Sequence, residues 1–117
     1  MSFQFQRLKV WEKAVELADL LIEIADGLPQ KYQFSFGEQL RRCALSIPSN
    51  IAEGSGRKTV RDSSNFYNIS KGSVYESMSI LIILSKRNLL NVDEKYKQKI
   101  YVLAEEICRM LTGLMRK

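Results

Sequence analysis

Apolar residues recur every three or four positions in four segments of this sequence, and no segment alternates apolar and polar residues over the length of a strand. This spacing predicts helices over about residues 10–26, 35–54, 59–86 and 93–115. Four helices with short connections pack as an antiparallel up-down-up-down four-helix bundle, so the predicted fold class is all-α. Because 117 residues suffice for one core and not for two, we expect residues 1–117 to form a single domain.

Residues that start or stop helices stand at the predicted boundaries. Gly27–Pro29 is expected to end the first helix, with the glycine in the left-handed conformation and the proline blocking continuation. Ser35–Glu38 has the pattern of a capping box, which predicts the start of the second helix. Thr59 or a neighbouring residue is expected to cap the third helix, and either Asn91 or Asp93 the fourth.

Pro48 falls inside the apolar stripe of the second helix, where a proline normally breaks a helix because it lacks an N–H and crowds the carbonyl of Ala44. The stripe nevertheless keeps its phase from Ile47 to Ile51. We therefore predict a kinked but continuous helix that ends near Gly54. The polar side chains expected to satisfy the freed carbonyl are Ser46, Ser49 and Asn50.

The third and fourth predicted helices carry more apolar surface than a single subunit needs to bury. The seam of the third helix contains three serines with Gly72 beside them, and these small residues would let a neighbouring helix approach closely. The stretch Ile80–Leu84 is apolar on every side, and the fourth helix has two apolar stripes. Both features predict a homo-oligomer in which another subunit covers Ile80–Leu84. The seam comprises Phe66, Ile69, Ser70, Ser73, Ser77, Ile80, Leu81 and Leu84.

The chain contains no histidine, which excludes Ser-His and Cys-His catalysis and every metal site with a histidine ligand. Cys43 and Cys108 are isolated in the sequence and fall on apolar helix faces, so we interpret them as reduced core thiols. The segment Gly54–Lys58 has glycines and cations but lacks the spacing of a phosphate-binding loop and its preceding strand. We therefore expect no enzyme activity, no metal and no cofactor.

The N-terminal residues do not form a basic stretch followed by an apolar one, so no secretory signal is predicted. The longest aliphatic run, residues 80–84, is much shorter than the about 20 residues that cross a bilayer. These observations predict a cytoplasmic protein without a membrane partner.

The net charge of +5 is unevenly distributed along the chain. Residues 1–40 carry −2, residues 41–71 carry +4 and residues 72–117 carry +3. In a bundle, the end of the second helix, the loop after it and the start of the third helix meet at one end, where cations would neutralise phosphates and Tyr67 would stack on an unpaired base. The alternative is a solvated helix end that only keeps the protein in solution. The candidate nucleic-acid contacts are Arg41, Arg42, Arg57, Lys58, Arg61 and Lys71.

The segment Ser46–Arg57 has the sequence Ser-Ile-Pro-Ser-Asn-Ile-Ala-Glu-Gly-Ser-Gly-Arg, and Gln39–Arg42 precedes it. These residues resemble the four-helix-bundle proteins encoded within intervening sequences of bacterial 23S ribosomal RNA genes. The resemblance covers about residues 8–86, whereas the fourth helix is similar only in character. Further matching residues are Leu8–Trp11, Ala14, Phe66, Lys71–Ser73 and Glu76.

This resemblance implies an antiparallel four-helix bundle that assembles as a ring-like homopentamer. A similar branch, the accessory variability determinant of diversity-generating retroelements, is a basic pentamer that binds a reverse transcriptase and nucleic acid. The resemblance carries no catalytic residue over to this chain. By analogy, Arg41, Arg42 and Arg57 would contact a polyanion or a protein partner, whereas Ser46–Asn50 would hold the helix at Pro48.

Two functions remain open at this point. The first is a non-enzymatic, oligomeric bundle that binds RNA, DNA or a nucleic-acid enzyme such as a reverse transcriptase through its basic end. The second is a protein-interaction or scaffold module with no nucleic-acid role, which the double apolar stripes favour.

Overall fold

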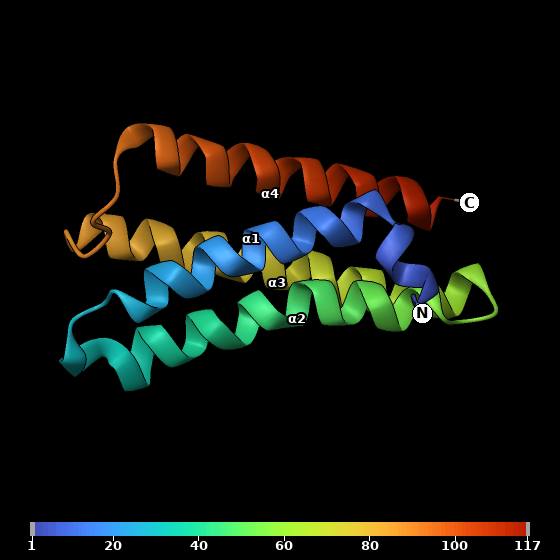
Figure 1. Cartoon of the computed structure of the whole chain (residues 1–117), viewed down its shortest axis with the longest axis horizontal. Helices are drawn as coiled ribbons and strands as arrows, with labels where there is room; N and C mark the ends of the chain where they lie inside the picture. The colour runs from blue at the N-terminus through green and yellow to red at the C-terminus, as the bar shows by residue number, and fades with distance from the viewer. Residues whose placement is uncertain (1, 117) are drawn as a thin grey trace.

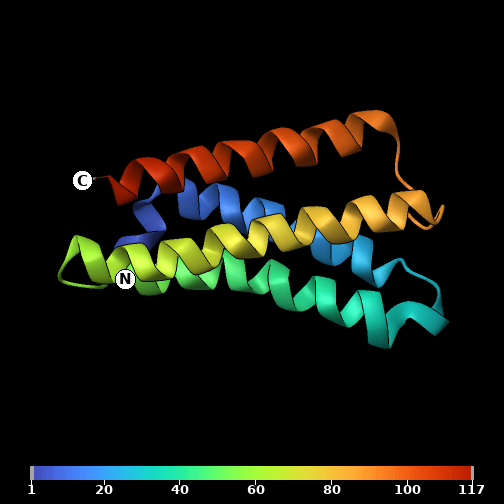
Figure 2. The same cartoon turned by 180° about the vertical axis from the view of Figure 1, so that it is seen from behind.

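The four predicted helices are present in the computed structural model, which describes residues 2–116 (Figure 1). They are α1 (Lys9–Asp26), α2 (Glu38–Ser55), α3 (Val60–Lys86) and α4 (Glu94–Met115). Consecutive helices run in opposite directions, and α4 packs on both α3 and α1 (Figure 1, Figure 2). No strand occurs among the described residues, so the predicted all-α antiparallel four-helix bundle is confirmed.

The helices α3 and α4 begin at residues that the sequence predicts as caps. The hydroxyl oxygen of Thr59 accepts the backbone N–H three residues further on at 3.1 Å, and a carboxylate oxygen of Asp93 does the same at 2.8 Å. Helix α1 ends at Asp26 as expected, but Gly27 has a φ of −83° and is not left-handed. Asn88, after the end of α3, does adopt the left-handed conformation, with a φ of 59°.

The predicted capping box at Ser35–Glu38 is wrong, because the chain is already helical before α2 begins. A short segment, η2 (Gln30–Tyr32), leads into a π-helical turn, η3 (Gln33–Gly37), which joins α2 directly. The backbone N–H of the first α2 residue therefore bonds to carbonyls of η3 and needs no side-chain cap. The Ser35 hydroxyl instead donates to the carbonyl of Tyr32 at 3.3 Å.

Helix α2 continues through Pro48, as the phase of the apolar stripe predicts. The amide nitrogen of Asn50 donates to the carbonyl and to the hydroxyl of Ser46, each at 2.9 Å. We expected a side chain near Pro48 to satisfy the carbonyl of Ala44. Among the described residues, Asn50 instead donates to the carbonyl of Ser46.

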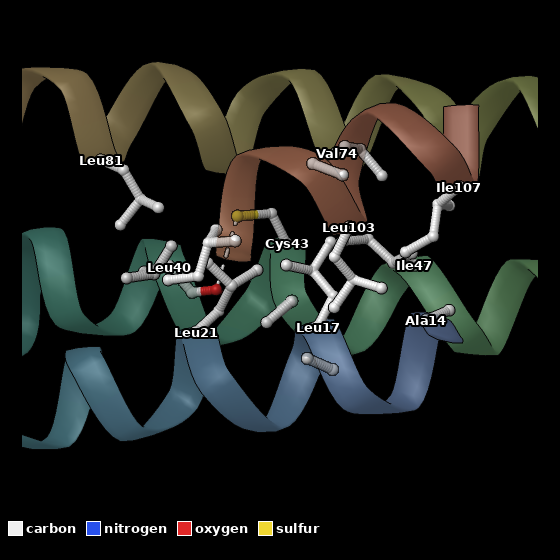
Figure 3. Packing of buried hydrophobic residues seen from close by; sticks show 14 of the residues in the cluster. Ala14, Leu17, Leu21, Leu40, Cys43, Ile47, Val74, Leu81, Leu103 and Ile107 are labelled. Atoms are coloured by element: carbon white, nitrogen blue, oxygen red, sulfur yellow. Dashed lines mark hydrogen bonds between the residues drawn. The ribbon is translucent and has the colours of Figure 1, made fainter. Parts of the chain in front are cut away.

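Apolar side chains from all four helices fill the centre of the bundle, as the close-up in Figure 3 shows for part of the cluster. Each buried square ångström of apolar surface contributes roughly 25 cal/mol, so this core is the main source of stability. The largest fully buried apolar residues are Leu17, Leu21, Leu40, Ile47, Ile51, Leu81, Leu84, Ile100, Ile107 and Leu111.

Serine side chains line the contact between α2 and α3. The Ser70 hydroxyl donates to the Ile47 carbonyl at 2.8 Å, and the Ser73 hydroxyl donates to a serine hydroxyl of α2 at 2.8 Å. The Ser77 hydroxyl lies 3.0 Å from the sulfur of Cys43. Small side chains therefore let α2 and α3 approach closely, as the serine seam predicts, and each buried hydroxyl has a partner.

Two residues in or beside the predicted seam of α3 do not face α2. Ile69 is 52% exposed, and a Cβ atom added at Gly72 would meet nothing within 4 Å among the described residues. The face of α3 that turns toward the core is defined by Ser70, Val74 and Ser77, which are buried. Ile69 and Gly72 are rotated away from that face and lie on the outer surface of α3, so they do not contribute to the close approach of α2 and α3.

We predict that Gly54→Ala destabilises the protein, because a Cβ atom at this position would lie 2.7 Å from the Cε1 atom of Tyr67. The free energy of unfolding should fall by about 1–3 kcal/mol, the usual cost of overpacking. Urea unfolding followed by circular dichroism measures this change.

The matched control is Gly113→Ala near the C-terminal end of α4. No glycine of the described chain has a positive φ, and this one has open space around it. Alanine there should raise the free energy of unfolding by roughly 0.5–1 kcal/mol, because it restricts the unfolded chain. Equal effects of the two substitutions would contradict the packing of Tyr67 on Gly54.

Candidate nucleic-acid interface

The antiparallel path of the chain brings three segments to one end of the bundle. Both termini lie at the same end as the connection between α2 and α3 (Figure 1, Figure 2). Exposed cations project from the N-terminal segment, from this connection and from the last two turns of α4. We call this group the basic end. It consists of Arg7, Lys9, Arg57, Lys58, Arg61, Arg109 and Arg116.

Three of the six predicted contact residues belong to the basic end. The guanidinium of Arg57 is held in place, because it pairs with Glu53 at 2.6 Å and lies 4.6 Å from the ring centre of Phe66. Among the described residues, Lys58 and Arg61 form no ion pair and are exposed. The connection thus presents two free cations beside one whose position is restrained.

Arg41 and Arg42 do not belong to the basic end, so the single six-residue surface that the charge pattern suggested is wrong. Both lie in the first turns of α2, and the helical rise of 1.5 Å per residue puts Arg41 about 24 Å from Arg57 along the bundle. Arg41 pairs with Asp26 at 2.9 Å and also contacts the side chain of Gln33. Arg42 pairs with Glu38 at 3.5 Å.

Lys71 lies in the middle of α3 and takes part in the contact with α4. Its ammonium group donates to the hydroxyl of Thr112 at 2.9 Å. It also lines a groove between α3 and α4 with a volume of about 590 Å³. Lys71 therefore joins two helices, and its ammonium group lies in a groove that Arg109 and Arg116 of the basic end also line. Further lining residues of the groove are Val74, Tyr75, Met78, Tyr101 and Cys108.

Tyr67 is not available for stacking on a base, contrary to our expectation. Its side chain is buried, and its ring packs over Gly54, where the backbone of α2 passes closest. The Ser63 hydroxyl donates to the carbonyl of the same glycine at 2.8 Å. These contacts fix the geometry of the connection between α2 and α3.

The sequence pattern missed four cations of the basic end. Arg7 and Lys9 come from an N-terminal stretch whose overall charge is negative, and Arg109 and Arg116 come from the last helix. They join the others only because the antiparallel fold returns the chain to the same end twice. The sequence did contain one indication of their location, since all four lie within a turn or two of a predicted helix end.

Two further findings concern residues 2–116. No three side chains among the cysteines, aspartates and glutamates are grouped so that they could hold a metal ion. No helix in this part of the chain combines the length and the apolar character that a membrane span requires.

A comparison with known protein families shows to which family this chain belongs. The sequence model of one family, described as 23S rRNA-intervening sequence protein, matches residues 6–113. The chain belongs to this family. No curated protein matches the chain. The matched range includes all of α1, α2 and α3 and most of α4, so it extends beyond residues 8–86, where the sequence resemblance was specific.

The segment Ser46–Arg57, on which the sequence resemblance to this family rests, forms the second half of α2 and the residues that follow it. Asn50 bonds to Ser46, and Gly54 admits the ring of Tyr67. These contacts support a structural role for the segment.

The two thiols of the chain differ in their access to solvent. Cys43 is buried at the contact of α2 with α3, as expected of a core thiol, whereas Cys108 is half-buried in the groove between α3 and α4. Burial raises the pKa of both thiols, and for Cys108 the charge of Lys71 partly offsets this rise.

We predict that iodoacetamide modifies Cys108 before Cys43, because Cys108 is half-buried in the groove between α3 and α4 whereas Cys43 is buried. The thiolate is the reactive form, so the raised pKa values should make both reactions slow at neutral pH and let their rates keep rising above about pH 9. Mass spectrometry of digested samples measures the two rates. In guanidinium chloride, where the chain is unfolded, the two rates should be equal. Equal rates in the folded protein would contradict the difference in access.

Proposed function

We propose that this protein is a non-enzymatic binding protein that contacts nucleic acid, or an enzyme that works on nucleic acid, through its basic end. The observation that carries this proposal is the convergence of exposed cations from three separate chain segments. The carboxylates close in sequence to these cations are Glu12, Glu53, Asp62, Glu105 and Glu106. Glu53 is already paired with Arg57, and Glu106 with Lys13.

Phosphate groups suit such a surface because their binding releases condensed counterions, which provides most of the affinity of non-specific complexes. A cation without a carboxylate partner gives up no ion pair when it binds a phosphate. Lys58 and Arg61 are in this position among the described residues. The affinity is therefore expected to fall steeply with salt concentration.

The polar side chains of the bundle support a non-enzymatic role. The hydroxyls of Ser70 and Ser73 donate to groups of α2, and the chain has no histidine to act as their base. The thiols of Cys43 and Cys108 have raised pKa values, which disfavour the nucleophilic thiolate.

The test compares two double variants with the same change in net charge. We expect Lys58→Glu with Arg61→Glu to weaken binding to RNA or DNA and to reduce the dependence of log affinity on log salt concentration by about two. Fluorescence anisotropy with labelled RNA and DNA at several salt concentrations measures both quantities.

The matched control is Lys86→Glu with Lys95→Glu, which changes two exposed lysines near the opposite end of the bundle. These substitutions should leave most of the affinity intact. Equal losses in the two double variants would contradict a role for the basic end, and so would the absence of binding by the original protein at low salt.

We also propose that the protein is a homo-oligomer in which a neighbouring subunit covers the outer face of α3. Of the stretch Ile80–Leu84, three residues are buried within the subunit and two are exposed. The exposed side of α3 is rich in apolar and small residues, and Glu76 is its charged member. The residues of this outer face are Ile69, Gly72, Tyr75, Glu76, Ser79, Ile82 and Ile83. A pentamer is what the family resemblance implies.

Light scattering tests this assembly. We expect a particle several times heavier than the 13.5 kDa chain, and we expect Ile82→Glu to shift it toward the monomer because the charge would be buried at the contact. Val102→Glu is the matched control, since Val102 on α4 is similarly exposed. A 13.5 kDa particle for the original protein would contradict the proposal.

The second candidate function is a protein-interaction module without a nucleic-acid role. The outer face of α3 and the adjacent groove between α3 and α4 favour it, because both are largely apolar and the groove is about 590 Å³ in volume. Purification of the protein from its cells before and after nuclease treatment distinguishes the candidates. One protein partner that survives nuclease, with no bound nucleic acid beforehand, would favour this second function.

A further inference from the structure

Three aromatic rings form a row in the N-terminal part of the chain. The ring centre of Phe3 lies 5.6 Å from that of Phe5 and the two planes differ by 8°, so the rings are stacked. The ring of Phe5 lies 5.0 Å from that of Trp11 and is tilted by 60°. Phe3 is the outermost of the three and is 63% exposed. The stack leaves the other face of the Phe3 ring open to solvent.

Local contacts hold this row in place. The N–H of Phe3 donates to the side-chain oxygen of Gln6 at 2.6 Å, and the N–H of Gln6 donates to the carbonyl of Phe3 at 3.1 Å. The inner rings of Phe5 and Trp11 line a depression between α1 and α2 that also includes Ala52, near the C-terminal end of α2. The exposed ring is therefore attached to the bundle and does not depend on a partner for its position.

Cations of the basic end flank the row. Arg7 and Lys9 follow Phe3 and Phe5 in the same segment and are exposed. The same end of the bundle carries the two free cations of the connection between α2 and α3. An open aromatic face beside cations is the combination with which proteins bind single strands, since bases stack on the ring while cations contact the phosphates.

We propose that Phe3 stacks on an unpaired base, so that the basic end binds single-stranded nucleic acid in preference to a duplex. This inference rests on the proposed function. In a duplex each internal base is already stacked on both faces, so the ring of Phe3 finds a partner only at the ends. RNA and DNA both offer an unpaired base, and the experiment compares the two.

The experiment measures the affinity of the full-length protein for labelled oligo(U) and oligo(dT) of about 12 nucleotides and for a mixed-sequence duplex of the same length. We expect tighter binding to a single strand than to the duplex. We expect Phe3→Leu, which keeps an apolar side chain without a ring, to weaken single-strand binding roughly tenfold and to leave duplex binding unchanged. Phe3→Trp should retain the single-strand affinity and show quenched fluorescence on binding.

The matched control is Phe34→Leu, because Phe34 is 82% exposed and lies at the opposite end of the bundle. It should change neither affinity. Equal loss for single strand and duplex, or no loss, in the Phe3→Leu variant would overturn the stacking role. A change in oligomeric state without a change in single-strand affinity would also overturn it, since Phe3 would then be a subunit contact.

The same measurements separate the two proposals. If strands and duplex bind equally well and only the Lys58→Glu with Arg61→Glu variant loses affinity, the basic end is supported and the stacking role is overturned. If neither oligonucleotide nor the duplex binds at low salt, both proposals are overturned.

Discussion

The close contact between α2 and α3 is the constraint on which the other features depend. Small side chains allow the two backbones to approach, and serine hydroxyls on α3 bond to groups of α2 across the gap. Near the end of α2 the contact residue is Gly54, which has no side chain, and the ring of Tyr67 occupies the space over it. No buried side-chain oxygen or nitrogen among the described residues lacks a partner, so the polar seam carries little desolvation cost.

This contact determines how the short connection between α2 and α3 leaves the bundle. With Gly54 held by Tyr67 and Ser63, the guanidinium of Arg57 comes to lie over Phe66, and the next cations project outward. The chain termini add further cations at the same end. Like charges this close repel one another, but exposure to water and salt keeps the cost small, and a bound polyanion would turn the repulsion into attraction.

Helix positions follow largely from local patterns, which is why they could be predicted. The apolar stripe carried α2 through Pro48, and Thr59 and Asp93 cap their helices through bonds that span three residues. The capping box at Ser35 failed because it assumed an extended chain before the helix, whereas a π-helical turn already supplies the carbonyls.

The candidate interface was predicted only in part, because charge counted along the chain does not give position in space. Arg41 and Arg57 belong to one basic segment of the sequence but lie at different ends of α2. Tyr67 was expected at the surface but is buried. The sequence pattern could not show this, because the orientation of a helical face depends on the helices packed around it.

The sequence by itself determined the fold class, the approximate starts of α3 and α4, the continuity of α2 and the net charge. Each of these depends on residues within a few positions of one another, or on composition alone. Only the tertiary structure decided which cations share an end, which aromatic ring is buried and which is exposed, and which face of α3 lacks a partner. These properties depend on the rotation of each helix and on the antiparallel return of the chain, which arise from packing between residues far apart in the sequence.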